Sequence, residues 1–140
     1  MFDSGALDAL VDEGVRRVFV EASRTRHLAI LVPATVLIEF SVGHGKGVAK
    51  AARVLKIVRP LPIGADIAMR ASELLIASAG GAADPSLTDA TVAAWAERYG
   101  AVATIDAKDL RALAAVGSGF DIYSVDELLR AMRREPRRRR

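Results

Sequence analysis

The alternation of short apolar runs with helix-length amphipathic stretches most constrains how this 140-residue chain can fold. Apolar runs of strand length occur at 28–32, 57–61 and 101–105, and a weaker one occurs at 121–124. The stretches between them, such as 65–79, place apolar residues at helical spacing. A chain that alternates strand and helix in this way favours an α/β domain with a mostly parallel sheet.

The N-terminus and the helices complete this pattern. Met1 and Phe2 predict a short first strand that ends at Asp3. Asp84 and Pro85 predict an N-cap followed by proline at the first helical position. The glycines of 43–47 predict a turn. Helices are expected at 6–10, 15–24, 33–42, 48–55, 65–79, 85–99, 108–116 and 126–134.

The length and composition suit one domain and exclude several kinds of protein. Cysteine is absent, which excludes disulfide scaffolds, thiolate zinc sites and cysteine nucleophiles. No apolar run approaches the roughly 20 residues that a membrane span needs. The first residues carry no basic and apolar signal region. We therefore expect a cytoplasmic protein with no membrane contact.

The net charge of +3 belongs to the end of the chain. Residues 133–140 hold six arginines and one glutamate, and residues 1–132 carry 14 basic and 16 acidic groups. We expect a folded domain over 1–132 and a basic, disordered tail over 133–140, because such a run of like charge repels itself. A tail of this kind also suits binding to RNA phosphates.

Four carboxylates stand where a parallel sheet would gather them. Asp3 and Asp106 follow two expected strands, and Glu39 and Asp89 lie in the early turns of two expected helices. Since groups at the carboxyl ends of strands meet in one crevice, the four acids are expected to converge. Carboxylates packed together need a counter-charge, and oxygen ligands select hard cations such as Mg²⁺ or Mn²⁺. Metal ions held in this way hydrolyse phosphodiesters.

Each acid alone also suits an ordinary structural role. Asp89 could simply stabilise the start of its helix, where negative charge is favoured. Asp109 could cap the short helix after the strand at 101–105. Glu39 is less easily explained in this way, because its neighbours Ile38 and Phe40 are apolar. The order and placement of the acids together indicate a site.

Four segments resemble the PIN domain, and in particular the VapC toxins of bacterial type II toxin–antitoxin pairs. The resemblance covers about residues 1–130. The first strand departs from it, since only two residues precede Asp3. The matching segments are Phe2-Asp3-Ser4-Gly5-Ala6-Leu7, Pro33-Ala34-Thr35-Val36-Leu37-Ile38-Glu39, Leu87-Thr88-Asp89-Ala90 and Ala103-Thr104-Ile105-Asp106-Ala107-Lys108-Asp109-Leu110.

The resemblance implies a fold, an activity and partners. The fold is a three-layer α/β/α sandwich with a parallel sheet of four to five strands in the order 3-2-1-4-5. The activity is that of a Mg²⁺- or Mn²⁺-dependent endoribonuclease, a hydrolase that cuts RNA phosphodiester bonds. The expected partners are an RNA substrate, a cognate VapB-like antitoxin that neutralises the toxin, and a second copy in a homodimer.

The resemblance also implies roles for individual residues. It assigns catalysis and metal binding to Asp3, Glu39, Asp89 and Asp106, with Asp3 and Asp89 as the first metal ligands. Three further residues lie beside the implied site, where they could orient a carboxylate or a water: Asp109, Thr104 and Ser4.

Two other functions remain open at this point. A receiver-like phosphotransfer domain also holds Mg²⁺ in an acidic pocket, but it needs paired acids after the first strand, and here Ser4 follows Asp3. A non-catalytic nucleic-acid-binding protein could use the arginine-rich tail alone.

Overall fold

The structure is a computed structural model that describes residues 1–43 and 48–134. The predicted turn at 43–47, apart from Gly43, and the part of the arginine-rich tail beyond Arg134 lie outside the described residues. Within the described ranges, none of the helices is long and apolar enough to cross a membrane.

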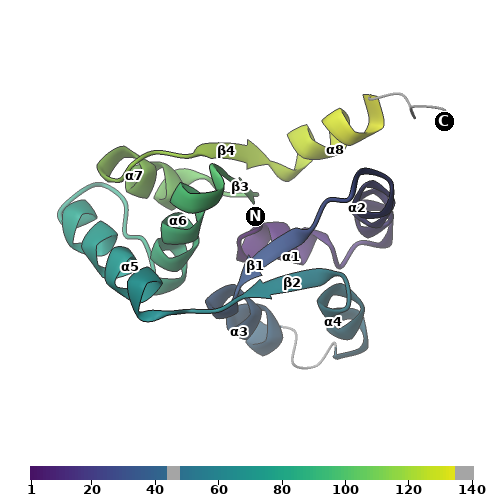
Figure 1. The fold of residues 1–140 in the computed structure, drawn as a ribbon, viewed down its shortest axis with the longest axis horizontal. Coiled ribbons are helices and arrows are strands. Elements are labelled where there is room, and N and C mark those ends of the chain that lie inside the picture. Colours follow the sequence, from purple (N-terminus) through teal and green to yellow (C-terminus); the bar gives the residue numbers. More distant parts are fainter. Residues whose placement is uncertain (44–47, 135–140) are drawn as a thin grey trace.

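Helices and short strands alternate along the described chain, which confirms the predicted α/β class (Figure 1). The eight helices of the described ranges are α1 (Ser4–Ala9), α2 (Glu13–Arg26), α3 (Ala34–Gly43), α4 (Val48–Leu55), α5 (Ala65–Ser78), α6 (Leu87–Tyr99), α7 (Lys108–Val116) and α8 (Val125–Arg134). The strands are β1 (Ile30–Pro33), β2 (Val58–Leu61), β3 (Ala101–Thr104) and β4 (Asp121–Ser124).

The four strands form two parallel pairs. β1 pairs with β2 in a register that sets Ile30 opposite Val58, and β3 pairs with β4 in a register that sets Thr104 opposite Ser124. Each pair is a separate two-stranded sheet within residues 1–43 and 48–134. The predicted sheet of four to five strands is therefore not shown.

The N-terminal segment lies between the two pairs and hydrogen-bonds to both. The Phe2 amide donates to the Leu31 carbonyl at 2.9 Å, and the Ala103 amide donates to the Met1 carbonyl at 2.7 Å. Phe2 and Ala103 form a single parallel bridge instead of a strand. The pairing ends there because the next residue, Asp3, already serves as the N-cap of α1.

Two clusters of buried side chains hold these elements together, and α6 contributes to both. Phe2 belongs to the larger cluster, with its ring edge-on to Phe19 at 5.0 Å between centroids. Val92 on α6 faces this cluster, whereas Ala93 faces a smaller cluster made with α5 and α7. Apolar residues around much of its circumference thus pack α6 against both clusters, and α6 lies beside α5 and α7 (Figure 1).

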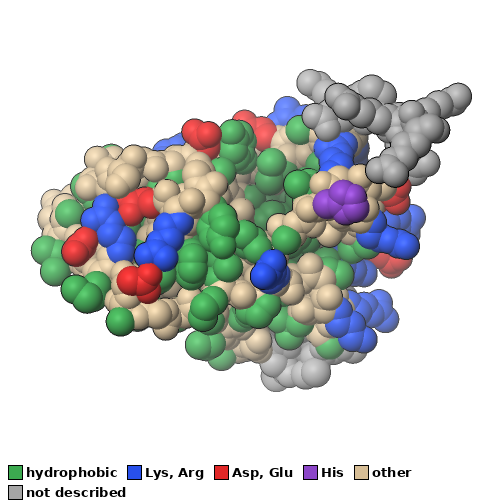
Figure 2. Space-filling model, in the orientation of Figure 1, with side chains coloured by type: hydrophobic (Ala, Val, Ile, Leu, Met, Phe, Trp, Pro, Cys, Tyr) green, Lys and Arg blue, Asp and Glu red, His purple; other side chains and the backbone are tan. Residues whose placement is uncertain are grey.

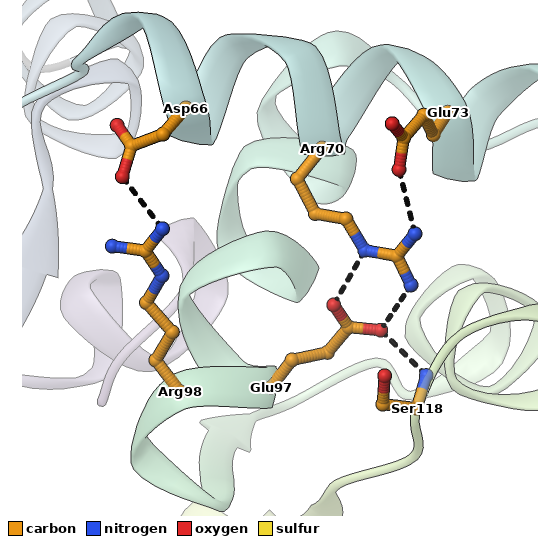
Figure 3. A network of polar contacts seen from close by, with 6 residues as sticks. All are labelled: Asp66, Arg70, Glu73, Glu97, Arg98 and Ser118. Atoms are coloured by element: carbon orange, nitrogen blue, oxygen red, sulfur yellow. Dashed lines mark hydrogen bonds and ion pairs between the residues drawn. The ribbon is translucent and has the colours of Figure 1, made fainter.

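A network of charged side chains fastens α6 to α5 (Figure 3). Nε and Nη2 of Arg70 donate to the two carboxylate oxygens of Glu97 at 2.7 and 2.9 Å, and the Ser118 amide donates to Glu97 at 2.6 Å. The Arg70 guanidinium holds the pKa of Glu97 below its usual range. Arg98 pairs with Asp66 at 2.6 Å on the same face, where the acidic and basic side chains interleave (Figure 2).

Candidate functional site

The Asp3 carboxyl is buried where the two strand pairs approach each other. The Asp3 amide donates to the Ala103 carbonyl at 3.2 Å, which ties this residue to β3. Its side chain then turns back as the N-cap of α1, where Oδ1 accepts a hydrogen bond from the Ala6 amide at 2.8 Å. Only 8% of Asp3 remains exposed.

Burial raises the pKa of Asp3 to about 6, because the charged form loses its hydration. Hydrogen bonds from the Thr104 hydroxyl and the Ala6 amide favour the charged form and lower the pKa in part. The negative charge of Asp89 raises it further. Two acids that lie 86 positions apart in the sequence are therefore close enough in space to affect each other.

Asp89 occupies the third position of α6, half-buried, inside a capping box formed with Ser86. Oδ2 of Asp89 accepts hydrogen bonds from the Ser86 amide at 2.9 Å and from the Ser86 hydroxyl at 2.7 Å. The Asp89 amide donates in return to the Ser86 hydroxyl oxygen at 3.1 Å. The predicted helix start at Asp84 and Pro85 is thus wrong, because Ser86 is the N-cap and α6 begins at Leu87.

Thr104 connects Asp3 to the segment after β3. Its side chain is buried, and its hydroxyl contacts the Asp3 carboxyl. The same hydroxyl oxygen accepts a hydrogen bond from the Asp106 amide at 3.0 Å and lies 2.8 Å from the Asp106 carbonyl oxygen. The Asp106 carboxylate is exposed and accepts a hydrogen bond from the Lys108 amide at 3.1 Å, at the start of α7.

The remaining predicted residues lie in different surroundings. Glu39 is exposed on α3, because Val36 and Phe40 take the core-facing positions on that helix. Ser4 is half-buried as the first residue of α1. Asp109 is also half-buried, and within the described residues its Oδ1 atom is buried without a hydrogen-bond partner.

The structure brings Asp3 and Asp89 near each other but does not form the expected four-acid cluster. Among the described residues, no group of three or more aspartate, glutamate or histidine side chains could hold a metal ion. The physical reason is local, since the Glu39 side chain is directed to solvent and the Asp106 side chain is engaged at the start of α7.

Of the predicted acids, Asp3 and Asp89 are the two that could together serve as ligands of a hydrated hard cation. Mg²⁺ retains several waters and is commonly bound through one or two carboxylates together with the phosphates of its substrate. Asp3 and Asp89 supply oxygen donors of this kind, and a cation between them would remove the electrostatic cost of burying the Asp3 charge.

Sequence reasoning overlooked Ser86 as a residue of this site. The signal was present in the spacing Ser86-Leu87-Thr88-Asp89, since a hydroxyl residue three positions before an acid is the pattern of a capping box. The pair Asp84 and Pro85 offered an equally ordinary helix start two residues earlier, which concealed that pattern.

Comparison with known proteins does not assign the chain to a family. No protein-family model matches the chain, and no curated protein matches it significantly.

Proposed function

We propose that this chain is a Mg²⁺- or Mn²⁺-dependent endoribonuclease with a PIN-like fold, similar to the VapC toxins. One observation carries the proposal. The buried Asp3 carboxyl lies at the ends of parallel strands and within electrostatic reach of Asp89. A strongly perturbed carboxyl with a specific charged neighbour is typical of a functional site.

The hydrogen bonds of the N-terminal segment support the fold that the proposal needs. Taken as a first, very short strand, residues 1–3 stand between β1 and β3. The spatial order is then β2, β1, the N-terminal segment, β3 and β4. Counted along the chain, this is the PIN-like order 3-2-1-4-5. A ligand site where the strand order reverses follows the general rule for such sheets.

Asp3 and Asp89 are the residues that would hold the cation. When bound, a divalent cation supplies an activated water and positive charge for phosphodiester hydrolysis. Asp3 must lose its proton to bind, and its contacts with Thr104 and Ala6 favour the deprotonated carboxylate. Asp106 and Glu39 remain proposed catalytic acids because of the resemblance, and both are exposed where substrate could reach them.

A cleavage assay with structured RNA and Mn²⁺ tests the proposal. We expect Asp3→Asn and Asp89→Asn to reduce the cleavage rate by about 100-fold or more, because each removes a ligand charge. Asp84→Asn is the matched control, since Asp84 is exposed five residues before Asp89. Glu39→Gln and Asp106→Asn in the same assay show whether these acids act with the pair.

Two results would contradict the proposal. Equal cleavage by wild type and by both pair variants would assign the activity to a contaminant. RNA binding without cleavage, lost when residues 133–140 are deleted, would favour the non-catalytic nucleic-acid-binding alternative.

The resemblance to VapC toxins also bears on where the enzyme acts, its oligomeric state and its inhibitor. It supports a cytoplasmic homodimer whose activity is neutralised by a VapB-like antitoxin. Such an inhibitor would have to block access of RNA to the proposed site at Asp3 and Asp89.

A further inference from the structure

We infer that Ser86 is a positioning residue for the proposed cation site and that it acts by fixing the carboxylate of Asp89. This inference rests on the proposed function, because it concerns how one of the two proposed ligands is held. Ser86 itself is exposed and is not proposed to touch the cation.

Both hydrogen-bond donors of Ser86 converge on one carboxylate oxygen. The amide and the hydroxyl donate to Oδ2 of Asp89 at 2.9 and 2.7 Å. Within the described residues, no hydrogen bond is formed to the other oxygen, Oδ1. The Ser86 contacts therefore hold the carboxylate in one orientation, with Oδ1 outside these contacts.

The short side chain of Asp89 restricts the orientation of its carboxylate more than a longer side chain would. A capping box usually carries glutamate or glutamine at the third helical position, whose longer side chain reaches back to the N-cap. Aspartate has one methylene fewer, so fewer torsion angles are left free once both Ser86 contacts are made. Hydrogen bonds of this kind orient metal-binding carboxylates in known sites.

The chain contains a matched pair of such caps. Ser124 makes the same three contacts with Glu127 at the start of α8, where its amide and hydroxyl donate to Oε2 at 2.7 and 2.9 Å. Glu127 is exposed, whereas Asp89 is half-buried and is one of the two proposed ligands. The two caps make the same hydrogen bonds, but only the cap at Ser86 holds a proposed metal ligand.

Binding of Mn²⁺ to the full chain, followed by the electron paramagnetic resonance signal of free Mn²⁺, tests the inference. Ser86→Gly removes the hydroxyl but keeps a residue that helices accept at the N-cap. We expect this variant to bind Mn²⁺ about 10-fold more weakly than wild type. Ser86→Thr restores the hydroxyl and should restore the affinity to within about 2-fold. Ser124→Gly should bind as wild type does.

The outcomes separate this inference from the proposed function. Wild-type affinity in Ser86→Gly, with Mn²⁺ binding by wild type intact, would overturn the inference alone and leave Ser86 as an ordinary cap. An equal loss of affinity in Ser124→Gly would also overturn it, because a general loss of helix stability would then explain both. Absence of Mn²⁺ binding by wild type would reject the proposed site together with the inference. Thermal unfolding of each variant without metal confirms that it is folded.

Discussion

At the scale of single residues, the Asp3 carboxyl works against folding at neutral pH. Its pKa is about 6 in the folded protein against an ordinary value of 3.8. The folded state therefore binds this proton more tightly than the unfolded state does. The stabilisation that the bound proton gives the folded state is fully present below about pH 4 and is lost as the pH rises through 6.

We expect Asp3→Asn to stabilise the metal-free protein above pH 6. Asparagine has the same shape without the charge, and its oxygen can still accept the hydrogen bond from the Ala6 amide. The difference between a pKa of 3.8 and one of about 6 corresponds to about 3 kcal/mol, which sets the upper bound of the gain. Urea unfolding in the presence of EDTA at several pH values measures this difference.

The pH dependence of the stability gained in Asp3→Asn tests whether the Asp3 carboxyl is the cause. The difference in unfolding free energy between Asp3→Asn and wild type should shrink as the pH falls from 8 toward 4. If the two proteins instead keep a constant difference over this range, the carboxyl is not buried as described. Asp84→Asn, which changes an exposed acid, should show no such gain.

At the scale of elements, the Arg70–Glu97 pair ties α5 to α6, the helix that carries Asp89. The Glu97 side chain is only 9% exposed, so it depends on its partners more than a surface acid does. We expect Arg70→Ala to lower the free energy of unfolding by about 1–3 kcal/mol, because a mostly buried carboxylate loses a bidentate partner. Chemical denaturation measures the loss.

The pair of Arg17 and Glu13 on α2 provides the comparison for this prediction. Its two side chains are 77% and 72% exposed, and the contact is 3.2 Å long. We expect Arg17→Ala to change stability by about 0.5 kcal/mol or less. Similar losses in both variants would show that Glu97 is not held as the structure indicates.

Most elements could be predicted from the sequence because their signals are local. The alternation of apolar runs and helical spacing gave β1–β4 and α5 close to their true bounds. The start of α6 could not be read as reliably, because two hydroxyl or acidic residues compete for the N-cap and only the folded contacts of Ser86 decide between them.

At the scale of the whole molecule, the segment around Phe2 connects the β1–β2 pair to the β3–β4 pair. The amide of Phe2 donates to the Leu31 carbonyl on β1, its neighbours Met1 and Asp3 hydrogen-bond to Ala103 on β3, and its ring packs on Phe19 in the larger core cluster. We expect Phe2→Ala to destabilise the protein by about 3–5 kcal/mol, as for other buried phenylalanines. Phe2→Leu should recover most of that loss. A loss below about 1 kcal/mol for Phe2→Ala would contradict this role for the N-terminal segment.

The site could be predicted only in part, because convergence is a property of the whole molecule. The sequence places Asp3 at a strand end and Asp89 in a first helical turn, and in the structure the charge of Asp89 acts on the Asp3 carboxyl. The sequence could not show that Glu39 is directed to solvent, since its apolar neighbours are consistent with either direction. It also could not show that the Asp106 side chain is engaged at the start of α7.

A crystal soaked in Mn²⁺ tests the central claim most directly, because the anomalous signal locates the cation without assuming its ligands. We predict a peak within bonding distance of carboxylate oxygens from both Asp3 and Asp89. A peak bound by other residues, or crystals with no peak beside Asp3 at saturating Mn²⁺ and a pH well above 6, would contradict the account.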